Sequence, residues 1–239
     1  MSTANASGLP PGVEKLREML AGAHDSGKWD SAWQAGLTPW DKGQAQAALV
    51  STLSEAKTSE LLPTSGRAVV PGMGRGYDVA LLASRGLHTV GVDISPKAVE
   101  AAQQWLDSQS STPASSQMSV RAADWFSLEP TQADSEEEND GTIKAFDLAY
   151  DYTFFCALPS TLHQKWADTY ARLIKPGGKL LCLVYPIGPL SDAGPPYNVS
   201  SDQHKALLSK AFELEHHAPP SKSAPERNGK EEIMIWRRK

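Results

Sequence analysis

Three glycines and an aspartate stand at spacings that suit the binding of a nucleotide-like ligand. Gly72, Gly74 and Gly76 follow one apolar segment, and Asp93 ends the next. Glycine tolerates tight turns and lets the backbone approach a ligand closely. A carboxylate at the end of a second strand can accept hydrogen bonds from both hydroxyls of a ribose. The pattern predicts the first half of a nucleotide-binding α/β sheet.

Polar and aromatic residues also follow the later apolar segments. Asp124 and Trp125 come after a third segment, Asp151 and Tyr152 after a fourth, and Tyr185 ends a fifth. Ligands bind such sheets at the carboxyl ends of the parallel strands, which all lie at one edge. We therefore expect these residues to surround one site.

The elements that must position these residues alternate between strands and helices. Strands are expected at 68–70, 88–92, 118–122, 146–151 and 180–185, followed by an antiparallel pair at 213–217 and 233–236. Helices are expected at 13–23, about 45–57, 77–85, 96–106 and 162–173. This alternation predicts an α/β sheet that is mostly parallel, with mixed direction at one edge.

The composition along the chain suggests a single domain with a short tail. Residues 1–12 are small, polar and proline-containing, and we expect them to be disordered. The domain then covers 13–239, with a helical, aromatic lid at 13–60 and an α/β core at 66–239. Residues 129–142 are acidic and poor in apolar side chains, so we expect a solvated surface insertion.

The bulk properties exclude several classes of function. The 239 residues carry a net charge of -5, so the chain has no general attraction to nucleic acid or to an anionic membrane. It lacks an apolar run near the ~20 residues that span a bilayer, and from the pattern of residues 1–12 we do not expect a secretory signal. Cys156 and Cys182 are expected to be reduced thiols, and the sequence shows no metal-ligand spacing. We expect a cytoplasmic monomer that acts on a small molecule.

Two classes of cofactor fit a glycine-rich turn followed by an acid: a nicotinamide or flavin dinucleotide, and S-adenosylmethionine. The dinucleotide pattern is GxGxxG, whereas this chain has Gly72-x-Gly74-x-Gly76. A dinucleotide also needs a second binding loop. The chain instead has Asp124-Trp125, Asp151-Tyr152 and the turn Lys175-Pro176-Gly177-Gly178 before its fifth strand. In these features it resembles the Rossmann-like class I methyltransferases that use S-adenosylmethionine, whose sheet has seven strands.

Four segments sharpen this resemblance to the thiopurine methyltransferase superfamily, and within it to the halide/thiol (thiocyanate) methyltransferases. They are residues 29–41, 70–78, 146–157 and 185–197. The similarity covers about residues 13–239 in order. The chain departs from the family in its serine-rich loop, in the acidic insertion and at Thr153, where a small aliphatic residue is usual.

The resemblance implies a binding site for S-adenosylmethionine and no metal. Asp93 would hold the ribose hydroxyls, Asp124 would accept the exocyclic amine of adenine, and Trp125 would lie against the ring. Asp78 either orders the glycine turn or caps its helix. The tryptophans of the lid would cover the cofactor, because aromatic faces attract cations. The expected cofactor-binding residues are Trp29, Trp33, Trp40, Gly72, Gly74, Gly76, Asp78, Asp93, Ile94, Asp124, Trp125 and Asp151.

The resemblance also implies a separate side of the site for the methyl acceptor. Tyr152 and Tyr185 are the expected catalytic residues, which orient the acceptor, and Leu20, Thr153 and Cys156 would line its pocket. Direct methyl transfer needs no covalent step, so Cys156 is interpreted as a buried thiol and not as a nucleophile. Arg75 and Arg227 are the cations that could add positive potential.

The expected reaction is in-line displacement of the methyl group onto a small soft nucleophile: a thiol or bisulfide, thiocyanate or a halide. Three alternatives remain open. The acceptor could be a larger thiol or amine metabolite. The chain could be an NAD(P)-dependent oxidoreductase, although the glycine spacing and the lack of a Tyr-x-x-x-Lys pair disfavour this. It could also sense the cofactor without catalysis.

Overall fold

The computed structural model describes residues 12–21, 26–109, 115–131, 141–190 and 192–239. Seven strands form one sheet in the order β3-β2-β1-β6-β7-β9-β8. Their bounds are β1 Arg67–Pro71, β2 His88–Asp93, β3 Met118–Ala122, β6 Phe146–Tyr152, β7 Ile174–Val184, β8 Phe212–Ala218 and β9 Glu232–Arg238. Only β9 runs antiparallel to its neighbours. The predicted α/β sheet with a terminal antiparallel pair is confirmed.

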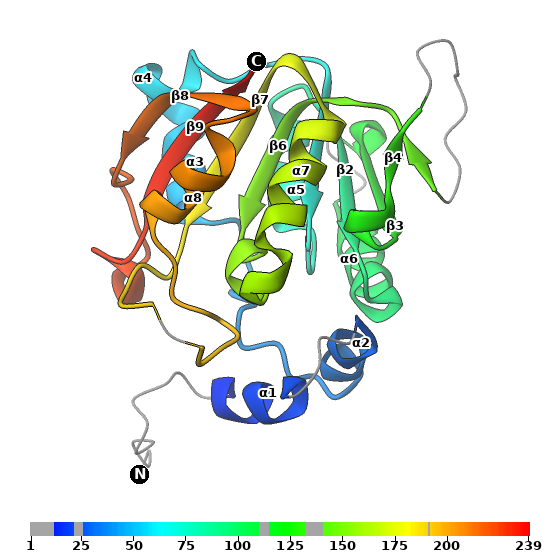
Figure 1. Ribbon diagram of the computed structural model, residues 1–239. Helices are drawn as coiled ribbons and strands as arrows, with labels where there is room; N and C mark the ends of the chain where they lie inside the picture. Colours follow the sequence, from blue (N-terminus) through cyan, green and yellow to red (C-terminus); the bar gives the residue numbers. More distant parts are fainter. Residues whose placement is uncertain (1–11, 22–25, 110–114, 132–140, 191) are drawn as a thin grey trace.

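Helices cover both faces of this sheet (Figure 1). On one face the core contains side chains of α3 (Ala47–Ser54), α5 (Tyr77–Ser84) and α6 (Pro96–Ser108). On the other face it contains side chains of α7 (His163–Leu173) and α8 (Ser201–Leu208). Because both faces are covered, the central strands are apolar on both sides, as in β1, where Ala68, Val69 and Val70 are all buried.

The residues at the start of α6 determine where this helix begins. The Ser95 hydroxyl accepts a hydrogen bond of 3.0 Å from the backbone N–H of Ala98 and so caps α6, and Pro96 occupies the first turn. Only Ile94 and Ser95 therefore separate α6 from Asp93, the last residue of β2. This geometry keeps the Asp93 carboxylate at the sheet edge.

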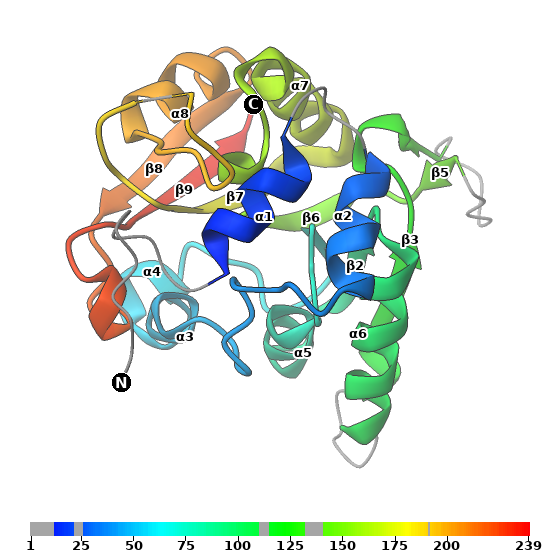
Figure 2. The same cartoon turned by 90° about the horizontal axis from the view of Figure 1, so that it is seen from below.

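Two helices near the start of the chain lie across the carboxyl end of the parallel strands. They are α1 (Val13–Leu20) and α2 (Ser26–Gln34), seen from below the sheet in Figure 2. Helix α3, which we predicted to be part of the lid, packs on the sheet face instead, with Ala48 and Leu49 in the same core cluster as Val70. Of the segment expected to form a lid, only the part before α3 lies over the edge of the sheet.

Some predicted boundaries were wrong. The helix expected at about 45–57 is split into α3 and α4 (Ala56–Ser59), because Glu55 between them has an extended backbone. The first helix ends at Leu20. Strand β7 begins at Ile174, which pairs with Phe146, and the register shifts before Lys179 pairs with Leu148. The Pro-Gly-Gly turn therefore lies within β7 and not before it.

Two helices and one small sheet had no counterpart in the prediction. Helices α2 and α8 were not predicted, although Ser200 and Gln203 form a capping box that marks the start of α8. The short strands β4 (Glu129–Pro130) and β5 (Thr142–Ile143) pair at the two ends of the acidic segment. The rest of that segment, 132–140, and the predicted tail 1–11 lie outside the described residues.

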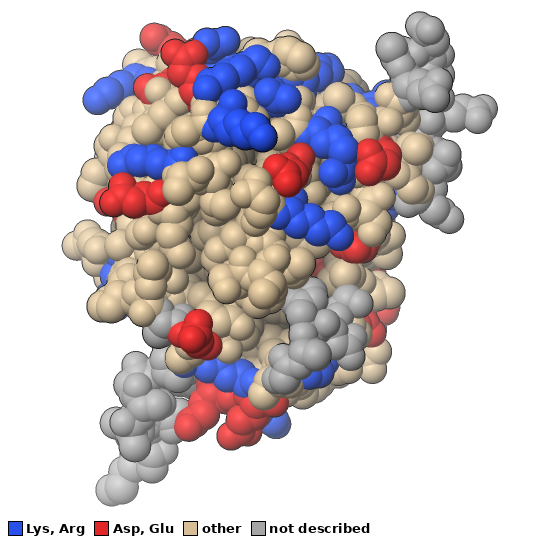
Figure 3. Space-filling model, viewed as in Figure 1, with Lys and Arg blue, Asp and Glu red and all other residues tan. Residues whose placement is uncertain are grey.

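No helix within the described ranges has both the length and the apolar character needed to cross a membrane. On the face seen in Figure 3, Lys and Arg side chains gather at the end of the molecule away from the lid.

Candidate functional site

A cavity of about 1080 Å³ lies between the carboxyl edge of the sheet and helices α1 and α2. One lining residue follows or ends each of five neighbouring strands: Gly72, Asp93, Asp124, Thr153 and Tyr185. The predicted residues that line it are Trp29, Trp33, Trp40, Gly72, Gly74, Asp93, Ile94, Asp124, Trp125, Thr153, Cys156 and Tyr185. The sheet edge therefore brings together most of the site predicted from the sequence.

The glycine turn after β1 forms the floor of this cavity. Gly72 and Gly74 have φ angles of 59° and 56°, in the left-handed region that glycine adopts without strain. A Cβ atom on Gly72 would lie 2.8 Å from the ring of Phe154. The turn therefore needs glycine both for its backbone conformation and for the close approach of its neighbours.

Asp93 is held at the cavity by the backbone around it. Its two carboxylate oxygens accept hydrogen bonds from the N–H groups of Gly74, at 3.1 Å, and Ser95, at 3.0 Å. The side chain is 8% exposed, and burial raises its pKa to about 6. At neutral pH the carboxylate is mostly ionised, with remaining lone pairs available for the hydroxyl groups of a ligand.

The three lid tryptophans form one aromatic cluster over the glycine turn. Trp40 meets Trp29 and Trp33 edge to face, with ring centroids 5.7 and 6.0 Å apart. The guanidinium of Arg75 lies 5.5 Å from the centre of the Trp33 ring and forms an ion pair of 2.6 Å with Asp41. Arg75 thus connects the aromatic cluster to the turn. It is not among the residues that line the main cavity.

Helix α2 is also tied to the core beside Asp93. The Asp30 carboxylate accepts hydrogen bonds from the Ser95 hydroxyl, at 2.7 Å, and from the backbone N–H of Lys97, at 3.0 Å. These bonds lower the pKa of Asp30, and the Ser95 bond is the largest cause. An ionised carboxylate at the start of α6 is also favoured by the helix dipole.

A short 3-10 helix, Trp125–Ser127, forms the side wall below β3. Both oxygens of Asp124 are engaged in capping it, by the N–H of Phe126 at 3.0 Å and the hydroxyl of Ser127 at 2.8 Å. Trp125 is buried against Tyr170, with ring centroids 5.3 Å apart. Its indole N–H is buried and has no hydrogen-bond partner among the described residues.

The opposite side of the cavity is built around Arg227. Its guanidinium lies 4.6 Å from the ring centre of Tyr185 and 5.1 Å from that of Tyr152, and donates a hydrogen bond of 2.7 Å to Gln46. The side chain is only 3% exposed, yet it lines the cavity. Arg227, one of the two cations expected to add positive potential, therefore lies at the cavity.

Thr153 and Cys156 stand beside this group. Thr153 has a φ of 54°, rare for a residue with a β-branched side chain, and its hydroxyl donates to the carbonyl of Tyr152 at 2.7 Å. Cys156 is 2% exposed, and burial raises the pKa of its thiol far above the ordinary value. Cys156 therefore remains a neutral thiol, as predicted.

Five predicted residues do not line the main cavity. Gly76 begins α5 with a φ of 83°, and a Cβ atom there would meet Ala102 of α6 at 3.5 Å, so its role is helix packing. Leu20 lies one turn too far along α1; Val13, Leu16 and Arg17 line the cavity instead.

Asp78 and Tyr152 line a second, much smaller space of about 50 Å³ behind the glycine turn. Asp78 accepts a hydrogen bond of 3.2 Å from the N–H of Gln46, and burial raises its pKa to about 6. The Tyr152 hydroxyl has no hydrogen-bond partner among the described residues. Asp78 thus connects α5 to the start of α3 and is not a residue of the main cavity.

Asp151 belongs to the core beneath α7. It is 3% exposed and accepts hydrogen bonds from the indole N–H of Trp166 at 2.6 Å and the hydroxyl of Tyr170 at 2.9 Å. Side chains alternate along a strand, so Asp151 and Tyr152 point to opposite faces of β6 and neither reaches the main cavity. Of these three consecutive residues, Thr153, which follows the strand, is the one that lines the main cavity.

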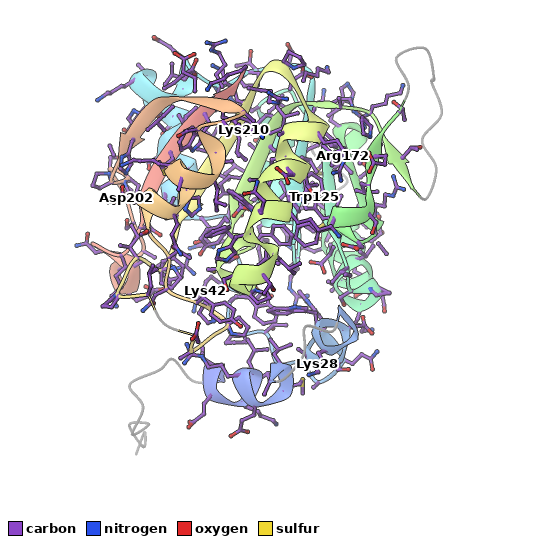
Figure 4. The ribbon with its side chains drawn as sticks, viewed as in Figure 1. Lys28, Lys42, Trp125, Arg172, Asp202 and Lys210 are labelled. Atoms are coloured by element: carbon purple, nitrogen blue, oxygen red, sulfur yellow. The ribbon has the colours of Figure 1, made fainter. Side chains whose placement is uncertain are left out.

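Sequence reasoning missed several cations of the cavity: Arg17, Lys42, Lys165 and Lys230. Figure 4 shows Lys42 between the end of the sheet and α1. Isolated cations on loops and amphipathic helices carry no local signal that separates them from ordinary surface charges. Only the fold brings them together. Among the described residues, no group of three His, Cys, Asp or Glu side chains could hold a metal ion.

Comparisons with known proteins agree with the family resemblance seen in the sequence. Residues 24–239 match the family model for thiopurine S-methyltransferase (TPMT). A probable thiol methyltransferase 2 from Arabidopsis thaliana is 36% identical, with 93% of this chain and 90% of the relative covered. Thiocyanate methyltransferase 1 from Brassica oleracea is 33% identical, with 96% and 92% covered.

Solved structures agree at the level of the fold. Magnesium protoporphyrin IX methyltransferase from Synechocystis, solved with bound SAM, has a TM-score of 0.62 at 16% identity, with 92% of this chain and 99% of that chain covered. At this identity the likeness extends to the fold and not to the acceptor.

Proposed function

The chain belongs to the thiopurine S-methyltransferase family, and from this premise we propose that it transfers the methyl group of S-adenosylmethionine to a small, soft, anionic nucleophile. The acceptor class is a thiolate or bisulfide, thiocyanate or a halide. The relatives named as thiol and thiocyanate methyltransferases support this acceptor class. The observation that carries the proposal is a cavity whose described lining residues include more cations than carboxylates, with Arg227 packed beside Tyr185.

One half of the cavity suits S-adenosylmethionine, which supplies a methyl group on a positively charged sulfur when bound. Asp93 can accept the two ribose hydroxyls, and Trp125 lines the cavity wall next to Asp124, where an adenine ring would rest. The backbone of Gly74 leaves room above the turn, and the rings of Trp33 and Trp40 border it. Aromatic faces there stabilise a sulfonium cation.

The charges that line the cavity favour an anionic acceptor. The cations are Arg17, Lys42, Lys165, Arg227 and Lys230, and the carboxylates are Asp93, Asp124 and Glu226, which gives five against three. The whole chain has a net charge of -5, so this local excess of cations is not a reflection of the composition. Positive potential in a cleft raises the local concentration of anions.

Few of the described lining residues could serve as a base for a neutral acceptor. No histidine is among the described residues that line the cavity. The Cys156 thiol is held neutral by burial, and the carboxylates of Asp93 and Asp124 are already engaged by neighbouring donors. The third lining carboxylate, Glu226, is exposed and stands next to Arg227 in the chain. An acceptor that arrives as an anion needs no proton removal. An amine, by contrast, must lose one before it can attack.

For such an acceptor, the work of the protein is positioning and desolvation. Arg227, packed on the rings of Tyr152 and Tyr185, would attract the anion, and the Tyr185 hydroxyl can orient it. The lid helices and tryptophans would exclude water, which removes the hydration that stabilises separated ions. An anion that attacks a sulfonium loses charge in the transition state, so a dry site favours the reaction.

An acceptor panel at fixed S-adenosylmethionine concentration tests this proposal. Release of S-adenosylhomocysteine would be measured with iodide, bromide, chloride, thiocyanate, bisulfide, thiophenol, a thiopurine and a primary amine. We expect turnover with the soft anions and none with the amine. Asp93→Ala should abolish turnover with every acceptor. Cofactor binding without turnover on any anion or thiol would reject the proposed acceptor class.

A further inference from the structure

Glu231 is a buried carboxylate that the proposed reaction does not use. It lies directly before β9, is 3% exposed, and is not among the described residues that line the cavity. The hydroxyl of Ser223 donates a hydrogen bond to this carboxylate, while its Oε2 atom has no hydrogen-bond partner among the described residues. An ionised carboxylate is costly to bury unless a positive charge compensates it.

The positive charge near Glu231 is that of Arg227. Burial lowers the pKa of Arg227, and the charge of Glu231 is the strongest influence that opposes this, ahead of Asp78. The orientation of the guanidinium has a different origin, because it donates a hydrogen bond of 2.7 Å to Gln46 and lies 4.6 Å from the ring centre of Tyr185. Neutral groups thus hold Arg227 in place, whereas Glu231 acts on it through its charge.

The loss of charge during methyl transfer limits how strongly Arg227 should hold the acceptor. A lone pair of the anionic acceptor forms the bond to the methyl carbon while the bond from that carbon to the sulfonium sulfur breaks, and that sulfur keeps the bonding pair. The acceptor therefore loses its negative charge on the way to the product. A cation beside it stabilises the bound anion more than the transition state, and only interactions that are stronger in the transition state speed the chemical step.

A carboxylate outside the cavity reduces this problem. With its full charge, Arg227 would bind the acceptor tightly, slow the transfer, and hold unreactive anions equally well. A buried negative charge near the guanidinium lowers the positive potential at the acceptor without occupying the acceptor's place. Charges act strongly on one another there, because buried surroundings screen them less than water does.

We propose that Glu231 tunes Arg227: its negative charge weakens the binding of the anionic acceptor and thereby raises the rate of methyl transfer. Glu231 does not line the cavity and acts only through Arg227. The inference rests on the proposed function, because it takes an anion beside Arg227 as the acceptor. It adds a residue, outside the cavity, that sets the balance between affinity and rate.

Three variants separate the charge of Glu231 from its packing. Glu231→Gln removes the charge and keeps the shape, and Glu231→Asp keeps the charge. Glu232→Gln is the matched control, because the carboxylate of Glu232, the next residue, pairs with His217 at 2.6 Å and not with Arg227. Burial raises the pKa of Glu231, while Ser223 and Arg227 oppose this rise, so the assays are run at pH 8, where the carboxyl is ionised.

The readouts separate binding from chemistry. They are the KM for thiocyanate, the Ki of nitrate as a competing anion that is a poor nucleophile, the single-turnover rate at saturating thiocyanate, and the Kd of S-adenosylmethionine by calorimetry. The Kd of the cofactor also establishes that each variant is folded.

We expect Glu231→Gln to lower both the KM for thiocyanate and the Ki of nitrate by about threefold to tenfold. The single-turnover rate should fall by about twofold to threefold, a smaller factor because part of the acceptor's charge remains in the transition state. Glu231→Asp and Glu232→Gln should stay within about twofold of wild type in all these values.

Two further variants test the route through Arg227. In the Arg227→Gln background, Glu231→Gln should have no additional effect on the KM or the Ki. Asp78→Asn removes the weaker of the two carboxylate charges that act on Arg227 and keeps an oxygen for the N–H of Gln46. It should shift the KM and the rate in the same direction as Glu231→Gln, by a smaller factor, and it provides the test if Glu231→Gln does not fold.

The inference is overturned if Glu231→Gln raises the KM for thiocyanate or slows the reaction without tighter binding of nitrate, since a residue that only supports the fold behaves in this way. It is also overturned if the effect of Glu231→Gln persists in full without Arg227. A wild-type protein that methylates no acceptor would instead reject the proposed function, and that result is distinct from both.

Discussion

The carboxylate of Asp30 on the lid accepts a hydrogen bond of 2.7 Å from the hydroxyl of Ser95 at the start of α6. The backbone N–H of Ser95 in turn donates to Asp93 at 3.0 Å. The residue that fastens the lid and the residue expected to hold the ribose therefore share one neighbour. Ser95 thus connects the attachment of α2 to the position of the Asp93 carboxylate.

Asp30→Ala should weaken the binding of S-adenosylmethionine by about tenfold. The variant loses two lid-to-core hydrogen bonds, each of which contributes about 0.5–1.5 kcal/mol. Calorimetric titration with the cofactor measures this. Lys97→Ala is the control, because Asp30 uses the backbone N–H of Lys97 and not its side chain. A loss of equal size in both variants would contradict the role given to Asp30.

Cofactor affinity should rise with pH through the titration of Asp93. Burial raises the pKa of Asp93 to about 6, so the carboxyl is protonated below that pH and has fewer lone pairs for the ribose hydroxyls. The Kd of S-adenosylmethionine should fall by up to about tenfold per unit as pH rises towards 6, then level off. Asp93→Asn should bind weakly at every pH and show no such dependence.

Asp78 provides the matched control for that titration. Burial raises its pKa to about 6 as well, but it lines only the small space behind the glycine turn. Asp78→Asn should therefore keep the pH dependence of cofactor binding. If Asp78→Asn removes the dependence and Asp93→Asn does not, the assignment of the two carboxylates is reversed.

Asp151 should matter for stability and not for cofactor binding. Tyr170→Phe removes a buried hydrogen bond of 2.9 Å to its carboxylate, and we expect the free energy of unfolding in urea to fall by about 1–3 kcal/mol. Tyr150→Phe removes a hydroxyl that has no hydrogen-bond partner among the described residues, so it should cost almost nothing. Neither variant should change the Kd of the cofactor. If Tyr170→Phe weakens cofactor binding without lowering the free energy of unfolding, Asp151 takes part in cofactor binding and this assignment is wrong.

Arg227→Gln should lower kcat/KM for thiocyanate by about tenfold to a hundredfold, because it removes the buried positive charge beside Tyr185. The Kd of S-adenosylmethionine should stay within about twofold of wild type, which also establishes that the variant is folded. Lys222→Gln, on the same connection between β8 and β9 but exposed, should leave both values unchanged. If kcat/KM for thiocyanate is unchanged in Arg227→Gln, Arg227 does not contribute to binding of the acceptor.

The sheet and the cofactor half of the site could be predicted because their signals are local. Apolar runs such as 68–70 are continuous when a strand is buried on both faces, and Gly74 and Asp93 stand at fixed places after two such runs. The three lid tryptophans were also placed correctly at the cavity. The signal in the sequence was the presence of three tryptophans within residues 29–40.

The errors arose where the fold decides the direction of a side chain. Asp151 and Tyr152 follow one another in β6, and the alternation of the strand turns them to opposite faces, away from the cavity. Leu20 lies one turn beyond Leu16, and its distance from the cavity depends on how α1 crosses the sheet edge. Arg17 was missed as a cavity residue because it is held by the carbonyls of Pro195 and Pro196, which are distant in the sequence.

The most direct test of the central claim is identification of the methylated product. Purified protein would be incubated with S-adenosylmethionine and thiocyanate, and the headspace analysed by gas chromatography with mass detection. The account predicts methyl thiocyanate in an amount equal to the S-adenosylhomocysteine released, and none with Asp93→Ala. A protein that binds S-adenosylmethionine but forms no methylated product from thiocyanate, bisulfide or iodide would contradict it.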